Sequence, residues 1–209
     1  VWKSTDNGNS WRKTRAPTTD LGYKLIMHPD NNQVLFYSNQ SRIFKSSDAG
    51  VTWTQKLYGS FTDIEFHPAD PSILHTAGGE GTYRSSDTGE TWHFVPTGPA
   101  GLRIEIAVTP ADPAYVYALA GGSSSTAGVF RSTDHGLTYT QVPSSFRFSG
   151  KYWYNLAFAA SPTDVNTLYG GEVLSYKSVD GGLNWSREQL GDVDHDAMEF
   201  FNGYLVLGN

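Results

Sequence analysis

Charged side chains at two places in this 209-residue chain have types and spacing suited to chemistry. Asp63 and Glu65 are two residues apart, and Arg103 and Glu105 repeat that spacing further along the chain. Because side chains two apart on a β-strand point to the same side, each pair would face one way. Two carboxylates across a channel are the equipment of a glycosidase, one as acid and one as base or nucleophile. Ion pairing along the edge of a sheet explains the same residues more simply, so both interpretations stay open.

A second group lies near the C-terminal end, where the segment Asp192–Asp196 holds three carboxylates and one imidazole. Its Asp-x-Asp-x-Asp spacing is superficially that of a calcium loop. An EF-hand needs Gly at position 6 and Glu at position 12, and the chain has Ala197 and Gly203 there. The case for Ca²⁺ is therefore weak, and no cofactor is predicted. A solvated acidic loop is the simplest interpretation, and in a hydrolase Asp192 or Asp194 would be the acid.

An aromatic cluster provides a different kind of candidate site. Trp153 stands between Tyr152 and Tyr154, and such rings offer faces on which a sugar or an extended peptide can stack. Packing of one or two of the rings between neighbouring sheets is the alternative. The residues predicted to contact a ligand are Tyr152, Trp153, Tyr154, Asp63, Arg103, Glu105 and His195.

The elements that position these residues are predicted from a repeated phrase, an eight-residue sequence motif that occurs five times. Its pattern is S-x-D-x-G-x-[T/S/N]-[W/Y]. Its first serines stand at positions 4, 46, 85, 132 and 178, which are 42, 39, 47 and 46 residues apart. A period in the forties with strand-like residues between the copies indicates radial repetition of small sheets, as in a β-propeller.

Each copy of the phrase has the chemistry of a tight turn. An Asp carboxylate accepts hydrogen bonds from backbone N–H groups two or three residues on, and the Gly two positions later takes positive φ at no steric cost. The aspartates are therefore predicted to form turns rather than to catalyse, and they are Asp6, Asp48, Asp87, Asp134 and Asp180.

A Pro-Asp motif recurs halfway between the copies, as in His28-Pro-Asp30 and His67-Pro-Ala-Asp70, and it predicts a hairpin. Counting strands from both motifs gives two strands, four complete four-stranded blades and two more strands. The whole chain 1–209 is then a single propeller segment, with third and fourth strands in 1–17, full blades over about 18–190, and first and second strands in 191–209. Two arrangements fit: a piece of a larger propeller, which we favour, or a closed five-bladed ring.

The repeated phrase resembles the Asp-box, or BNR repeat, of sialidases, xyloglucanase-type glycoside hydrolases and sortilin-like receptors. The segment 192–209 is also similar to a stretch of secreted Bacteroidetes propeller proteins. The resemblance implies an all-β propeller of four-stranded antiparallel blades. Sialidase activity is not expected, because it needs three clamping arginines. Arg84 and Arg131 stand where other repeats carry Lys3, Lys45 and Lys177.

Composition limits the partners. The net charge is −6 and no cluster of Lys or Arg is present, which argues against nucleic acid. No apolar run approaches the roughly 18–20 residues of a membrane span. The chain has no cysteine, so disulfides are excluded. The resemblance and the charge-poor composition favour an extracellular or cell-surface location.

Together these features predict a binding module within a longer secreted protein, with a glycan or a protein or peptide as ligand. No complete catalytic set can be assembled from the sequence. A xyloglucanase-like hydrolase acting on a β-glucan is the alternative, because the xyloglucanase-type relatives use similar repeats.

Overall fold

A computed structural model describes residues 1–15, 20–122, 127–147, 150–189 and 196–208. Every regular element in these ranges is a β-strand. The residues in these ranges contain no helix that could span a membrane.

Four antiparallel sheets of four strands each form the body of the molecule, and we call them blades one to four. Blade one contains β3 (Gly22–Met27), β4 (Leu35–Asn39), β5 (Arg42–Ser46) and β6 (Thr54–Tyr58). Blade two contains β7 (Phe61–Phe66), β8 (Leu74–Gly78), β9 (Gly81–Ser85) and β10 (His93–Val95). Blade three contains β11 (Arg103–Val108), β12 (Val116–Gly121), β13 (Gly128–Ser132) and β14 (Thr140–Gln141). Blade four contains β15 (Ala157–Ala160), β16 (Leu168–Gly171), β17 (Ser175–Ser178) and β18 (Ser186–Glu188).

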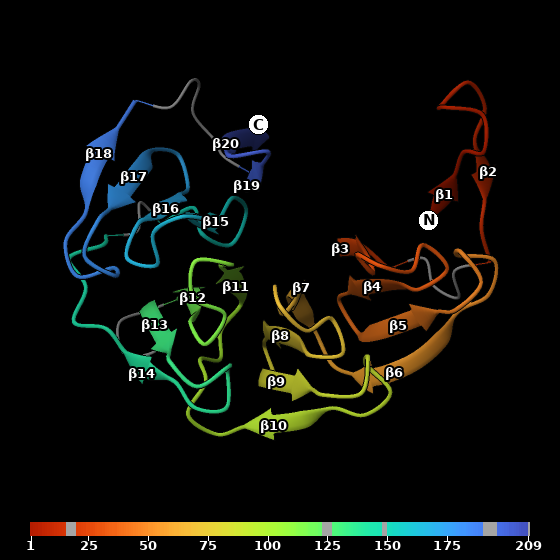
Figure 1. The fold of residues 1–209 in the computed structure, drawn as a ribbon, viewed down its shortest axis with the longest axis horizontal. Helices are drawn as coiled ribbons and strands as arrows, with labels where there is room; N and C mark the ends of the chain where they lie inside the picture. Colours follow the sequence, from red (N-terminus) through yellow and green to blue (C-terminus); the bar gives the residue numbers. More distant parts are fainter. Residues whose placement is uncertain (16–19, 123–126, 148–149, 190–195, 209) are drawn as a thin grey trace.

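Two shorter sheets flank the blades. One pairs β1 (Trp2–Lys3) with β2 (Arg12–Lys13), and the other pairs β19 (Ala197–Phe201) with β20 (Tyr204–Gly208). The sheets follow one another around a centre, with β3, β7, β11, β15 and β19 innermost (Figure 1). The predicted β-propeller of four-stranded antiparallel blades is confirmed, and the described ranges contain the twenty strands of the sequence count.

The alternative arrangement, a closed ring of five blades, is not the one observed. In the described parts of the chain, β1–β2 and β19–β20 remain separate sheets, and no backbone pairing joins them. Each flanking sheet instead contacts the blade beside it. Met198 of β19 packs on Ala157 and Ala159 of blade four, and Lys3 of β1 bonds to the Ala49 carbonyl of blade one.

The hydrophobic core lies between successive blades. Phe36 and Ile43 of blade one pack on Phe61, Ile64 and Leu74 of blade two, and all five side chains are fully buried. Similar clusters join blades two and three, and blades three and four. Because apolar side chains are buried between each pair of successive blades, the stack fixes the inner strands around the centre.

The five repeated phrases fold into nearly identical loops between the third and fourth strands, which we call box turns. In each, the Ser hydroxyl donates to the Asp carboxylate at 2.7–2.8 Å and accepts the Gly N–H at 2.8–3.0 Å. The carboxylate in turn accepts the backbone N–H four residues on, at 2.8–2.9 Å.

That backbone hydrogen bond spans four residues, whereas the sequence pattern predicts a bond over two or three. The loop is wider because two successive residues are left-handed rather than one, as Asn7 (φ 57°) and Gly8 (φ 85°) show in the first copy. The hydrogen bonds from the Ser10 side chain and backbone hold the pKa of Asp6 at about 2, and those from Thr52 do the same for Asp48.

A cation on the third strand of one blade reaches the box turn of the next. Lys3 Nζ lies 2.8 Å from the Ala49 carbonyl oxygen, Lys45 Nζ 2.6 Å from that of Thr88, and Arg84 Nε 2.9 Å from that of His135. Each acceptor is the left-handed residue between the Asp and Gly of the box turn. Lys and Arg therefore alternate between repeats because both can donate to a backbone carbonyl.

Candidate functional site: a charged pocket on the inner strands

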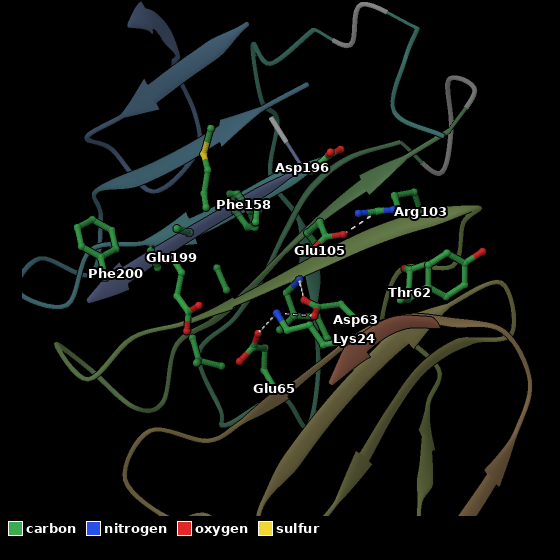
Figure 2. A pocket seen from close by; sticks show the side chains of 18 of the residues that line it. Lys24, Thr62, Asp63, Glu65, Arg103, Glu105, Phe158, Asp196, Glu199 and Phe200 are labelled. Carbon is green, nitrogen blue, oxygen red and sulfur yellow. Dashed lines mark hydrogen bonds and ion pairs between the residues drawn. The ribbon is translucent and has the colours of Figure 1, made fainter. Parts of the chain in front are cut away.

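A pocket of about 370 Å³ lies at the centre of the propeller, against the inner strands. Residues from β3, β7, β11, β15 and β19 line it, so every blade and the C-terminal flanking sheet contribute. Its wall combines an ionic network with an apolar side, and Figure 2 shows both.

Asp63 is the most buried member of the ionic network, with a side chain that is 1 % exposed. Its carboxylate accepts the backbone N–H of Ile64 at 2.9 Å and, across the blade boundary, that of Ile106 at 2.7 Å. Lys24 Nζ lies 3.1 Å from the same carboxylate. Because these contacts hold both oxygens, Asp63 joins blades two and three at the wall of the pocket.

Lys24 extends from β3 between two carboxylates, and its Nζ also lies 2.7 Å from Glu65 Oε1 (Figure 2). Burial alone would lower the pKa of Lys24, but Asp63, Glu65 and Glu105 together raise it above the ordinary value. Burial raises the pKa of Glu65 to about 7, despite the opposing effect of Lys24, and the charge of Asp63 adds to the rise. The ammonium thus stays charged while Glu65 is poised to exchange a proton near neutral pH.

Arg103 and Glu105 form a second ion pair one blade further on, with Nε 2.8 Å from Oε1. Burial raises the pKa of Glu105 to about 8, with a further contribution from Asp63, and Arg103 only partly opposes this. The side chain of Glu105 is 13 % exposed, so it still borders the pocket. Burial of several carboxylates near few cations is the common cause of both raised glutamate pKa values.

The register of the repeats explains why these groups meet. Lys24, Asp63 and Glu105 each stand four residues before the residue that precedes the Pro of a Pro-Asp turn, so they hold one repeat position in three blades. Ala157 holds that position in blade four. Lys24 was missed by the sequence analysis, although aligning the inner strands on their turns would have placed it beside Asp63.

The opposite side of the pocket is largely apolar. Phe158, Ala159 and Ala160 come from β15, and Met198 and Phe200 come from β19. Glu199 also lines this side, and its charge contributes to the raised pKa of Glu65. A ligand in the pocket would therefore meet charged and hydrogen-bonding groups on one side and mainly carbon surface on the other.

The predicted aromatic residues form a turn just before β15. Trp153 and Tyr154 are 60 % and 65 % exposed and meet edge to face, with ring centroids 5.7 Å apart. Tyr152 is half-buried against Gly121, where a Cβ would lie 2.7 Å from the tyrosine side chain. Gly121 pairs with Arg103 across β11 and β12, so the turn lies at the Arg103 end of blade three. Of the three rings, Tyr152 packs between blades and the other two face outward.

The other sequence candidates are distributed as follows. Asp192, Asp194 and His195 lie outside the described residues. Asp196 is described, is exposed, and lines the pocket. In the described ranges no group of His, Asp and Glu has an arrangement suited to a metal ion. The five box-turn aspartates lie in the loops between the third and fourth strands, outside the pocket lining.

The arrangement is suited to recognition of a polar ligand. Paired donors and acceptors are already held in place, which lowers the cost of ordering them when a ligand enters. A carboxyl with a pKa near 7 or 8 can also donate a proton at neutral pH, which is the property of a general acid.

No family model matches this chain. Among curated proteins, a xyloglucanase from Paenibacillus sp. is 24 % identical over 153 residues, which cover 68 % of this chain and 13 % of that enzyme. Among solved structures, the GH74 xyloglucanase from Xanthomonas campestris superposes with a TM-score of 0.67 at 16 % identity, covering 90 % of this chain and 34 % of the other. YCF48 from Cyanidioschyzon merolae has a TM-score of 0.61 at 13 % identity, with 92 % and 64 % covered.

These similarities establish the β-propeller fold and the likeness to part of xyloglucanases. The chain spans only about an eighth of the length of the Paenibacillus enzyme, since 13 % of that enzyme is matched. The propeller is thus a fold shared with GH74 enzymes and with YCF48, a protein also solved with a bound D1 peptide.

Proposed function

We propose that this chain is the binding portion of an extracellular or cell-surface propeller protein, and that it holds a glycan or a peptide at the charged pocket. The observation that carries the proposal is the pocket itself. Five inner strands converge on a cavity of about 370 Å³ with two preformed ion pairs, Lys24–Glu65 and Arg103–Glu105. Preorganised polar groups beside apolar surface are the usual composition of a ligand site.

The state of the carboxylates favours binding over catalysis. A glycosidase needs one protonated acid and one ionised base or nucleophile. Asp63 is enclosed and bonded to two backbone N–H groups, so it is not free to attack a substrate. Glu65 and Glu105 both have raised pKa values, whereas the two roles require values that differ in opposite directions.

The exposed pair Trp153 and Tyr154 supplies a second contact surface. Both rings stand on the turn that leads into β15, and β15 supplies the apolar wall of the pocket. A sugar ring or a peptide side chain could stack on the aromatic pair while a polar group enters the pocket. YCF48, which shares the fold, has been solved with a peptide bound, and this precedent supports a peptide as ligand.

The alternative is a xyloglucanase-like hydrolase acting on a β-glucan. It is favoured by the curated relatives, which are xyloglucanases, and by the pKa of Glu105, raised to about 8 as in a general acid. Asp192 and Asp194 remain the sequence-based candidates for that acid. In this alternative the chain supplies one part of a site completed elsewhere in a longer protein.

A combined binding and turnover assay distinguishes the two. The chain, and any longer protein that contains it, would be titrated with β-glucan oligosaccharides and with short acidic, basic and neutral peptides, while reducing ends are counted. A binding module should bind at least one of these ligands without releasing reducing ends. Trp153→Ala should lower the affinity for that ligand about tenfold or more, because an aromatic stacking contact is lost. Tyr58→Ala is the matched control, since Tyr58 is 70 % exposed on the outer strand β6.

Release of reducing ends would overturn the binding proposal in favour of the hydrolase. In that case Glu105→Gln, Asp192→Asn and Asp194→Asn identify the acid, because the correct variant loses turnover and keeps affinity.

A further inference from the structure

The contact between blades two and three differs from the other blade contacts by a cluster of three imidazoles. His67 follows β7 and His75 lies in β8, whereas His135 occupies the box turn of blade three. Nε2 of His67 lies 3.0 Å from Nδ1 of His135, and the ring centroids are 5.2 Å apart. The ring of His75 is 6.3 Å from that of His67. We call these three residues the histidine joint.

The hydrogen bonds determine where the protons lie. Nδ1 of His67 accepts the backbone N–H of Asp70 at 3.1 Å and that of Ala69 at 3.3 Å, so this nitrogen carries no hydrogen. The hydrogen of the neutral ring is therefore on Nε2, which donates to Nδ1 of His135. A proton added to Nδ1 of His67 would break the two hydrogen bonds that this nitrogen accepts in the Pro-Asp turn.

The surroundings of His75 disfavour a charged imidazole. It is fully buried, and neither ring nitrogen has a hydrogen-bond partner among the described residues. Gly136 of the box turn covers it so closely that a Cβ there would lie 2.5 Å from Cε1. A proton on His75 therefore requires the box turn to move away and admit water.

The charged groups around the joint add to this effect. Arg84 of β9 donates to the His135 carbonyl at 2.9 Å and brings a permanent positive charge to the cluster. Asp70, beside His67, is already bonded to Ser72, and Asp134, near Tyr139, is bonded to Ser132 and Thr138. Burial and Arg84, with the other two imidazoles, lower the pKa of His75 to about 3.

The pKa of His67 is lowered as well, by burial and by His135, although the Pro113 carbonyl and Asp70 act in the opposite direction. Folded-state pKa values below the ordinary histidine value mean that the unfolded or opened state binds more protons. The stabilising effect is complete above about pH 6.5 and is progressively lost as the pH falls toward 3.

We propose that the histidine joint is an acid-released contact, which holds blade three against blade two at neutral pH and opens when the buried imidazoles of His67 and His75 are protonated. The opening is confined to the side of the blade contact away from the centre. At the inner strands, Asp63 and Thr62 hold β11 through the N–H groups of Ile106 and Ile104, and these bonds involve no imidazole.

Amide hydrogen exchange at pH 7 and pH 5, expressed as protection factors, tests the proposal with an internal control. The blade-three box turn (residues 132–139) should lose protection by about tenfold or more at pH 5, as expected for uptake of one proton over 1.5 pH units. The blade-two box turn (residues 85–92) is held by Lys45 and no imidazole, and should change less than twofold. Its Asp87 has a pKa of about 2, so it remains ionised throughout.

Two variants sharpen the result. The double variant His75→Phe, His135→Asn removes two of the imidazoles, and Asn tolerates the left-handed φ of 60° at position 135. Its box turn should lose less than threefold protection at pH 5. His28→Asn, at the equivalent position of blade one, should keep the full response of the original chain.

Equal loss of protection in the two box turns of the unaltered chain would overturn the proposal, and this comparison does not depend on whether a variant folds. An acid response that survives in the folded double variant would also overturn it.

Discussion

Lys45 of blade one extends into the box turn of blade two, where its Nζ lies 2.6 Å from the carbonyl oxygen of Thr88. The same ammonium binds Glu90 at 2.7 Å and stands over the ring of Phe36, 5.6 Å from its centroid. Lys45 is only 7 % exposed. One side chain therefore joins two blades by a backbone hydrogen bond and an ion pair, and it also makes a cation–π contact within its own blade.

This contact predicts the effect of removing the charge. Lys45→Met keeps the aliphatic stem but leaves the Thr88 carbonyl without its donor, so the free energy of unfolding should fall by about 1–3 kcal/mol. Lys56→Met is the matched control, because Lys56 binds the half-exposed Glu90 at 2.6 Å and such pairs contribute about 0–1 kcal/mol. Urea denaturation of both variants measures the difference. Equal losses would show that the link to Thr88 contributes nothing beyond the surface pair.

The box turns also depend on close approach of the next blade. Gly89 has φ +70°, and a Cβ there would lie 2.3 Å from the ring of Phe36. Gly89→Ala combines left-handed strain with overpacking and should cost about 3 kcal/mol or more.

Gly203→Ala separates these two contributions. Gly203 has a similar φ of +81°, with no other atom within 4 Å of an added Cβ, so only the strain of about 1–2 kcal/mol is expected. The measurement is the difference between the two variants in thermal or urea unfolding. If Gly203→Ala proved as costly as Gly89→Ala, the contact with Phe36 would not be the cause.

The buried carboxyl of Glu105 in the pocket should make the stability of the protein depend on pH. Burial raises the folded-state pKa of Glu105 to about 8, above the ordinary value of 4.5. Such a group favours folding below its unfolded pKa, and the benefit is lost as the pH rises through 8. Glu105→Gln should therefore stabilise the protein by about 1–3 kcal/mol at pH 9, and have little effect near pH 4.

Thermal melts of Glu105→Gln and the unaltered chain across pH 4–9 check this. Glu188→Gln, which changes a carboxylate outside the pocket lining, is the control variant. A constant difference between Glu105→Gln and the original chain at all pH values would contradict the raised pKa.

The sequence predicted the propeller because its repeats are local. Each box turn is specified by a Ser, an Asp and a Gly within five residues, so the pattern is visible without knowledge of distant contacts. The left-handed residue before each Gly was not predicted, because Asn7, Ala49, Thr88 and His135 share no chemical property that signals positive φ. Its conformation follows from the hydrogen bonds that close the loop.

The site was harder to predict because its partners come from different blades. Asp63 and Glu105 were singled out, but Lys24, 39 residues before Asp63, is their shared cation. Similarly, His67 and His135 are 68 residues apart and meet only because blades two and three stack. Contacts between repeats depend on the geometry of stacking, which the residues of one repeat do not encode.

The most direct test of a ligand-binding pocket is calorimetric titration with the glycan and peptide panel, repeated on the double variant Glu65→Gln, Glu105→Gln. The proposal predicts that at least one ligand binds without release of reducing ends. It also predicts that the double variant weakens that ligand about tenfold or more, while Glu90→Gln on the outer surface leaves the affinity unchanged. Equal affinity in the double variant, or no binding of any ligand on the panel, would contradict it.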